Sequence, residues 1–122
     1  MSQLTRGELE IMDIVWQRGR VTVQDVCDSL ARPLAYTTVM TVLKTLETKR
    51  RVVKKVKEGR AFVYEPRVTR DDVCRTVADE LKQHLARGSV KSLVLNLIED
   101  EAIPSDELAE IKQAIARLES QS

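Results

Sequence analysis

Two capping signals mark the starts of the first two expected helices. Thr5 is followed three residues later by Glu8, a capping-box pattern, and apolar residues then recur at helical spacing. Gly19 is expected to end this helix, because glycine favours the left-handed backbone at a helix C-terminus. Thr22 with Asp25 repeats the capping pattern. The pattern therefore predicts one helix beginning at Thr5 and a shorter one beginning at Thr22.

A third helix is predicted from about Tyr36 to Lys49. Its apolar residues fall on one face: Val39, Val42, Leu43 and Leu46. The opposite face, at about 100° per residue, carries Thr37, Thr41, Lys44 and Thr48. An ordinary exposed helix usually carries more charge than this outward face does.

The spacing of apolar residues then changes to that of a β-hairpin. Residues 52–57 are β-branched and basic, and residues 61–64 are β-branched and aromatic. Gly59 lies in the short segment between them, and Pro66 is expected to end the second strand. The pair predicts a two-stranded antiparallel hairpin.

Helical spacing returns after Pro66, where the composition also becomes acidic. Thr69 with Asp72 gives a further N-cap signal, followed by apolar residues in steps of four: Val73, Val77, Leu81 and Leu85. Gly88 is expected to break this helix before an apolar helix over 89–98. Pro104 and Ser105 open a last helix, whose apolar stripe is Leu108, Ile111, Ile115 and Leu118.

This order of elements defines the expected fold class. Three helices, with a short turn between the second and third, are followed by a hairpin and further helices. We therefore expect a mainly α protein with an N-terminal winged helix-turn-helix and a C-terminal helical dimerisation segment. The expected domains are a DNA-binding domain over 1–68 and a dimerisation domain over 69–122.

Charge is unevenly distributed along the chain, although its net value is only +1. Residues 32–70 hold eleven basic and three acidic side chains, whereas residues 71–122 hold six basic and eleven acidic ones. A basic middle segment suggests an anion-binding face, and charge alone leaves open an ordinary solvated surface.

The fold and the charge together predict contacts to double-stranded DNA. In a winged helix-turn-helix the third helix enters the major groove, and the basic wing reaches phosphates beside it. The expected DNA-binding residues are Tyr36, Thr37, Thr38, Met40, Thr41, Lys44, Lys55, Lys57 and Arg60. The alternative is that the outward face of the third helix is only a solvated surface. In that case, substituting Thr41 or Lys44 with alanine would leave operator binding unchanged.

The acidic C-terminal helices predict a homodimer. Their apolar stripes are too rich for a helical segment of about 50 residues to bury against itself. A second chain would cover them and present two recognition helices to an inverted repeat. The candidate interface residues are Leu93, Leu97, Leu108, Ile111 and Ile115, and packing within one subunit remains the alternative.

Three motifs resemble one known family. They are Leu9-Glu10-Ile11-Met12 with Trp16, the string Ala35-Tyr36-Thr37-Thr38-Val39-Met40-Thr41, and Glu58-Gly59-Arg60-Ala61-Phe62-Val63-Tyr64. Together they are similar to the BlaI/MecI/CopY family of penicillinase repressors, over nearly the whole chain. The resemblance implies a dimeric repressor of inverted-repeat operators, with its recognition helix at 36–49. At 49–51 this chain has Lys-Arg-Arg where the family usually has a glycine, so the helix must end without one.

The resemblance also implies a route of induction. In the β-lactam-responsive members a membrane-bound sensor metalloprotease cleaves after an asparagine in the stretch that matches 92–96. The corresponding bond here is Asn96–Leu97, although the family site has phenylalanine after the asparagine.

Several kinds of chemistry are not expected. The chain has no Gly-rich phosphate loop and no nucleophile with its base, so no catalytic residues are assigned and no enzymatic activity or cofactor is expected. His84 has no partner at ligand spacing, and the clustered cysteine pairs of the copper-responsive relatives are missing, so no metal site is expected. Without a signal segment, a cytoplasmic location is expected, with Cys27 and Cys74 as reduced, core or near-core thiols.

One alternative function remains from the sequence. A winged helix can serve as a protein–protein interaction module without specific DNA binding. The basic wing and the threonine-bearing helix argue against it, and salt-dependent binding to duplex DNA distinguishes the two.

Overall fold

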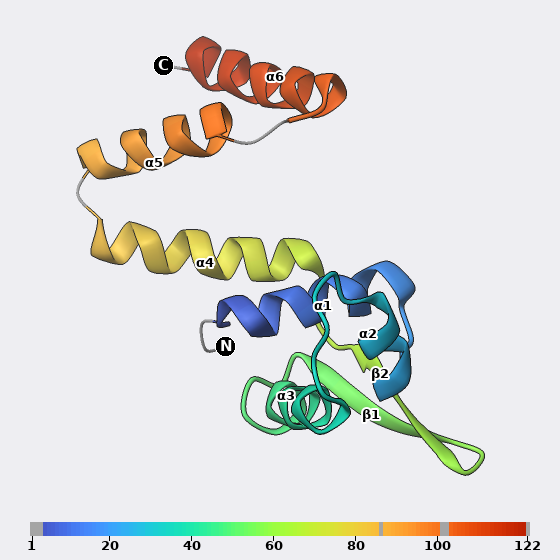
Figure 1. Ribbon diagram of the computed structural model, residues 1–122. Helices are drawn as coiled ribbons and strands as arrows, with labels where there is room; N and C mark the ends of the chain where they lie inside the picture. The colour runs from blue at the N-terminus through green and yellow to red at the C-terminus, as the bar shows by residue number, and fades with distance from the viewer. Residues whose placement is uncertain (1–3, 86, 101–102, 122) are drawn as a thin grey trace. The chain divides into compact units, whose positions relative to one another are not determined.

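The computed structural model describes residues 4–85, 87–100 and 103–121. Within these residues it contains six α-helices and one two-stranded sheet, in the order predicted from the sequence. Their bounds are α1 Arg6–Arg18, α2 Val23–Ser29, α3 Tyr36–Thr48, β1 Val53–Glu58, β2 Ala61–Pro66, α4 Arg70–His84, α5 Arg87–Asp100 and α6 Ser105–Gln121 (Figure 1).

The chain forms two compact units, Met1–Glu80 and Leu81–Ser122. The first unit holds α1 to α3, the hairpin and most of α4, and the second holds the end of α4 with α5 and α6. A domain boundary between residues 68 and 69 stays a prediction of the sequence.

The capping boxes predicted for α1 and α2 are both present. The Thr5 N–H donates to Glu8 Oε1 at 2.8 Å, and the Glu8 N–H donates to Thr5 Oγ1 at 3.2 Å. Thr22 and Asp25 make the same reciprocal pair at 2.9 and 3.0 Å. Gly19 ends α1 with φ 77°, and its N–H donates to the Val15 carbonyl. The helix ends are stable at these positions because the N–H and carbonyl groups left without an intrahelical partner are bonded by groups within four residues.

An aliphatic core joins the helices of the first unit to its hairpin. Side chains from α1, α2 and α3 meet those of the residues at the start of the hairpin, because each helix turns its apolar stripe inward. The fully buried members are Ile11, Met12, Val15, Val21, Val26, Val39, Leu43, Leu46, Val52 and Val53. Burial of this stripe fixes which face of α3 points outward.

The hairpin is antiparallel, with Val53 opposite Pro66 and Glu58 opposite Ala61. Gly59 begins its two-residue loop at φ 63°, a backbone value that a hairpin turn of type II′ needs at this position. Val21 pairs with Tyr64 through N–H to carbonyl bonds of 3.0 and 2.7 Å, which ties the α1–α2 connection to β2. The far end of the hairpin projects beyond the three helices as a wing (Figure 1).

The connection from α3 to β1 turns without glycine, as the sequence requires. Arg51 adopts φ 57°, a left-handed conformation that disfavours a side chain. The Arg50 N–H donates to the Thr45 carbonyl and the Val52 N–H to the Leu46 carbonyl, both at 3.0 Å. These bonds satisfy carbonyls at the helix end and hold the strained residue in place.

The start of α4 is fastened to α1 around Trp16. The indole Nε1 donates to the Val68 carbonyl at 2.9 Å. The Arg70 guanidinium lies 5.0 Å from the centre of the Trp16 ring and also pairs with Asp13. Thr69 and Asp72 form the predicted cap of α4 through bonds of 2.9 and 3.0 Å.

Two expectations about the later helices are wrong. Gly88 does not separate α4 from α5, since α4 ends at His84 and Gly88 lies in the first turn of α5, where a glycine is tolerated at modest energetic cost. Cys74 is exposed rather than near-core, because its neighbour Val73 occupies the inward position; Cys27 is half-buried against the core.

None of the helices in the described part of the chain combines the length and apolar character needed to span a membrane.

Candidate nucleic-acid interface

Helix α3 exposes all six of its side chains that the sequence predicts for DNA contact. Val39, Leu43 and Leu46 are buried on its inner face. The outer face exposes Tyr36, Thr37, Thr38, Met40, Thr41 and Lys44. Tyr36 and Met40 are 50% and 44% exposed, which is high for large apolar side chains. This face therefore combines apolar surface with short polar groups and only one charge.

Three of the five threonines of α3 direct their hydroxyl protons back to the helix. Thr41 donates to the Thr37 carbonyl at 2.9 Å, Thr45 to the Thr41 carbonyl at 3.1 Å, and Thr48 to the Lys44 carbonyl at 2.8 Å. Each hydroxyl has one proton, so what remains available outward is a methyl group and an acceptor lone pair. Such a surface suits thymine methyl groups and base-edge donors.

The first turn of α3 differs from those of α1 and α2. Ala35 occupies the N-cap position and supplies no side-chain hydrogen bond, and the first turn contains no acidic residue. The amide groups at this helix start are thus not covered by a side-chain acceptor, and they favour an approaching anion over a cation.

The wing carries exposed cations at its strands and loop. Within the described part of the chain, Lys55, Lys57 and Arg60 have no ion-pair partner. The Lys55 ammonium lies 4.4 Å from the ring centre of Phe62, which is itself 48% exposed. These three charges are available to phosphate groups.

Lys54 and Arg20 are instead held by wing carboxylates. Lys54 Nζ lies 3.5 Å from Glu65 Oε1. Arg20 Nη1 donates to Glu58 Oε2 at 2.9 Å, and its Nε and Nη2 both donate to Glu65 Oε2, at 3.0 and 2.8 Å. Hydrogen bonding from Arg20 lowers the pKa of Glu65, and hydrogen bonding to Glu65 raises that of Arg20. No pattern in the sequence indicated this group, because Arg20 and Glu65 lie 45 residues apart.

A buried ion pair supports the end of α3 from behind. Arg50 Nε donates to both oxygens of Glu8, at 3.2 and 3.0 Å, and only 7% of the Glu8 side chain is exposed. Burial alone would raise the pKa of Glu8, but bonds from Arg50 and Thr5 outweigh it and lower the pKa. This pair couples the N-terminus of α1 to the turn between α3 and β1.

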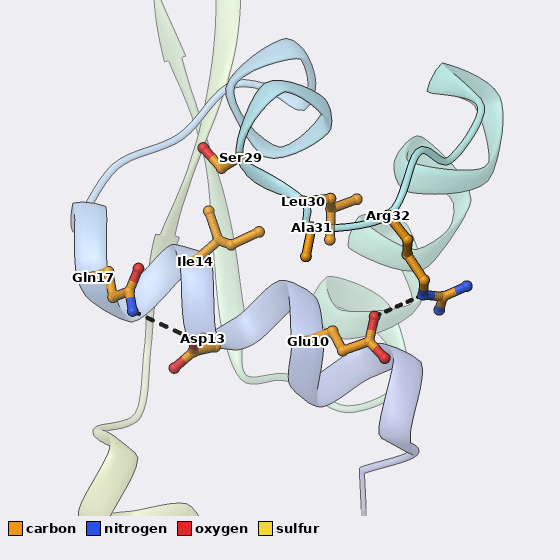
Figure 2. Close-up of a pocket in the computed structure, with 8 residues that line it drawn as sticks. All are labelled: Glu10, Asp13, Ile14, Gln17, Ser29, Leu30, Ala31 and Arg32. Carbon is orange, nitrogen blue, oxygen red and sulfur yellow. Dashed lines mark hydrogen bonds and ion pairs between the residues drawn. The ribbon is translucent and has the colours of Figure 1, made fainter.

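A hollow of about 410 Å³ lies between α1 and the α2–α3 connection (Figure 2). Its polar side chains are already paired: Arg32 bonds to Glu10 at 3.1 Å, and Gln17 to Asp13 at 3.4 Å. Ile14 and Leu30 supply apolar lining. The hollow thus lacks groups arranged for catalysis and belongs to the packing of α1 against the turn.

The predicted interface residues of the C-terminal segment lie on two helices. Leu93 and Leu97 are on α5, and Leu108, Ile111 and Ile115 are on α6. None of the five is buried, and Leu97 is 57% exposed. Asn96, before the bond predicted to be cleaved, is exposed within α5.

A core of three helices with an exposed third helix and a basic hairpin defines a winged helix-turn-helix protein. The chain belongs to the penicillinase repressor family, whose model matches residues 4–117. The resemblance seen in the sequence motifs is therefore confirmed.

Named relatives cover nearly the whole chain. It is 38% identical to the transcriptional regulator BlaI of Mycobacterium tuberculosis, over 98% of this chain and 90% of the relative. It is 27% identical to the penicillinase repressor of Bacillus licheniformis, over 93% and 89%. These names are those of regulators, which confirms the expectation of a non-enzymatic protein.

Solved structures support the fold of the first unit. The solution structure of the DNA-binding domain of the repressor BlaI matches with a TM-score of 0.50 and 30% identity, covering 57% of this chain and 87% of that one. The monomeric form of B. licheniformis BlaI in complex with the blaP half-operator matches equally well, covering 58% and 88%. The predicted winged-helix fold is thereby confirmed.

Proposed function

We propose that this protein is a transcriptional repressor that places α3 in the major groove of operator DNA and its wing on the neighbouring phosphates. The observation that carries the proposal is the outer face of α3, which is nearly uncharged and lies in one unit with wing cations that have no ion-pair partner among the described residues. A solvated surface helix would instead favour paired charges. The complex of the related BlaI with a half-operator supports the same use of the fold.

The chemistry of α3 assigns different roles to its exposed residues. An α-helix about 10–12 Å across fits a major groove about 12 Å wide, so small side chains allow a close approach. Thr37 and Thr41 offer methyl groups and acceptors to base edges, and Lys44 offers a donor. The remaining three, Tyr36, Thr38 and Met40, lie near the start of α3. From there they would contact the DNA sugar-phosphate backbone or the neighbouring bases. Lys55, Lys57 and Arg60 supply charge without sequence preference.

The second unit supports assembly as a homodimer. From Leu81 onward, no residue whose side chain the structure describes is buried, although α5 and α6 carry the exposed apolar residues Val94, Leu95, Leu97, Ile115 and Leu118. Apolar surface of this extent on one segment marks an interaction site, and a second copy would cover it. Two copies would match an operator with inverted-repeat symmetry.

Relief of repression by proteolysis would follow from the position of Asn96–Leu97. The bond lies in the interior of α5, so a protease would reach it only after local unwinding. Cleavage would remove α6 together with Leu108, Ile111 and Ile115, and the dimer would lose much of its interface. The protease that the family resemblance implies is a membrane-bound sensor metalloprotease acting on a cytoplasmic repressor.

Binding of the full chain to duplex DNA tests the proposed function. The promoter region of its own gene should bind more tightly than a scrambled duplex, and both affinities should fall with salt. Arg60→Ala should weaken binding to both duplexes and flatten the salt slope by about one unit. Lys112→Ala, which removes the same charge from α6, should leave the slope unchanged. Binding without salt dependence would favour the protein–protein module instead.

A further inference from the structure

Arg20 lies in the connection between α1 and α2, and its guanidinium joins this helical part of the first unit to both strands of the wing. Arg20 precedes Val21, whose backbone pairs with Tyr64, so backbone and side chain reach β2 at neighbouring positions. One edge of the guanidinium binds Glu65 on β2, and Nη1 binds Glu58 at the end of β1. Glu58 is adjacent to the wing loop. One side chain thus holds two carboxylates from two strands, a geometry that only the planar fork of arginine allows.

The same contact decides which wing charges a phosphate encounters. Glu65 also lies opposite Lys54 in the hairpin and pairs with it. Arg20 and Lys54 together match the two negative charges of Glu58 and Glu65. Lys55, Lys57 and Arg60 are left without a carboxylate partner in the part of the chain that the structure describes. If Arg20 were absent, Glu58 would lie unpaired next to Lys57 and two residues before Arg60. It could then bind these cations in place of DNA, and it would repel phosphate.

We infer that Arg20 is a positioning residue of the DNA-binding wing: it fixes the hairpin to the body and occupies Glu58 and Glu65, without itself contacting DNA. This inference rests on the proposed function, since it concerns how the wing is presented to phosphate.

A double-mutant cycle on the full chain tests this role. The probe is a fluorescent mixed-sequence duplex, because the wing contributes affinity that does not depend on sequence. Arg20→Ala should weaken binding about fivefold in the parent protein, and less than about twofold in the Glu58→Gln/Glu65→Gln background, where no carboxylates remain to be occupied. Arg20→Lys keeps the charge but cannot bridge both carboxylates, so it should also lose affinity in the parent.

Five outcomes separate the inference from its competitors. Equal losses in both backgrounds would mean that Arg20 contacts phosphate directly, and would overturn the inference. Unchanged affinity of Arg20→Lys would show that charge alone suffices, and would overturn it as well. Arg18→Ala removes a charge two residues away and should have little effect; a loss equal to that of Arg20→Ala would also count against a special position. If the parent itself does not bind the duplex, the proposed function fails and the inference falls with it, whereas a binding parent with an unaffected Arg20→Ala refutes only the inference.

Discussion

Replacing Arg50 with methionine should destabilise the first unit far more than its place near the surface suggests. Methionine keeps most of the aliphatic stem but leaves the Glu8 carboxylate buried without its cation. Arg50 donates to both Glu8 oxygens at 3.2 and 3.0 Å, and 7% of the Glu8 side chain is exposed against 25% for Arg50. Breaking a fully buried pair costs about 3–5 kcal/mol. The partial exposure of Arg50 reduces the expected loss to about 2–3 kcal/mol.

Urea unfolding followed by circular dichroism measures this loss, at one fixed protein concentration because association adds to stability. A folded unit of the size of Met1–Glu80 has a total stability of roughly 4–12 kcal/mol, so the change should move the midpoint clearly. Arg32→Met is the matched control. It breaks an Arg–Glu pair of 3.1 Å that is also anchored on α1 but has exposures of 58% and 34%, and it should cost less than about 1 kcal/mol.

The pH dependence of the same pair follows from the lowered pKa of Glu8. A carboxyl group whose pKa is lower in the folded state stabilises the fold above its unfolded pKa, and this contribution disappears as the pH falls through the folded value. Glu8→Gln keeps the capping acceptor but loses the charge, so the parent should be the more stable protein at neutral pH. The difference should shrink as the pH falls below about 4.5, the ordinary value for glutamate. Equal losses for Arg50→Met and Arg32→Met, or a difference that is independent of pH, would refute the role assigned to this buried pair.

Substitutions at three other positions test separate features. Thr41→Val keeps a methyl group and loses the acceptor, whereas Thr41→Ser keeps the acceptor and loses the methyl group. If the methyl group contacts thymine, Thr41→Ser should lose about 1 kcal/mol of operator-binding free energy in a fluorescence anisotropy titration. Equal affinities of the parent for operators with thymine and with uracil would contradict that contact. Leu108→Asp should shift the protein from dimer to monomer in sedimentation and weaken operator binding steeply, because one half-site loses the avidity of two; an intact dimer would place the interface elsewhere. Arg51→Gly relieves the left-handed strain at φ 57° but adds entropy to the unfolded chain, so it should change the free energy of unfolding by less than about 1 kcal/mol. Arg51→Val should lower the melting temperature, and a valine variant with an unchanged melting temperature would show that this turn is not strained.

Local signals were sufficient to predict most of the fold. The Thr5 and Thr22 caps, the end of α1 at Gly19 and the hairpin loop at Gly59 all depend on groups within four residues of one another. Such groups determine the backbone directly, whatever the rest of the chain does. The exposed face of α3 was also predictable, because its apolar stripe has a single orientation that buries it.

Features that depend on distant parts of the chain were not predictable. The contact of Arg20 with Glu65 and that of Glu8 with Arg50 join residues 45 and 42 positions apart, and neither has a local pattern. The prediction for Cys74 was wrong for a different reason: Val73, the first residue of the predicted stripe of α4, takes the inward position, and Cys74 lies one residue, about 100°, away from it. The break predicted at Gly88 was wrong because α4 ends before it, at His84, and Gly88 falls in the first turn of α5, where a glycine is tolerated at modest energetic cost.

The fastening of α4 to α1 gives the molecule a built-in optical reporter. Trp16 is the single tryptophan of the chain, and its indole is bonded to the Val68 carbonyl and covered by Arg70. Its emission therefore reports on one junction, the docking of the start of α4. A second hollow lies between α1 and the start of α4 and is lined by Trp16, Arg70 and Cys74 among others. Cys74 is exposed there and offers a position for an acceptor dye. With Cys27 replaced so that only Cys74 carries the dye, energy transfer between the two would follow whether α4 stays docked while DNA binds, without any added tryptophan.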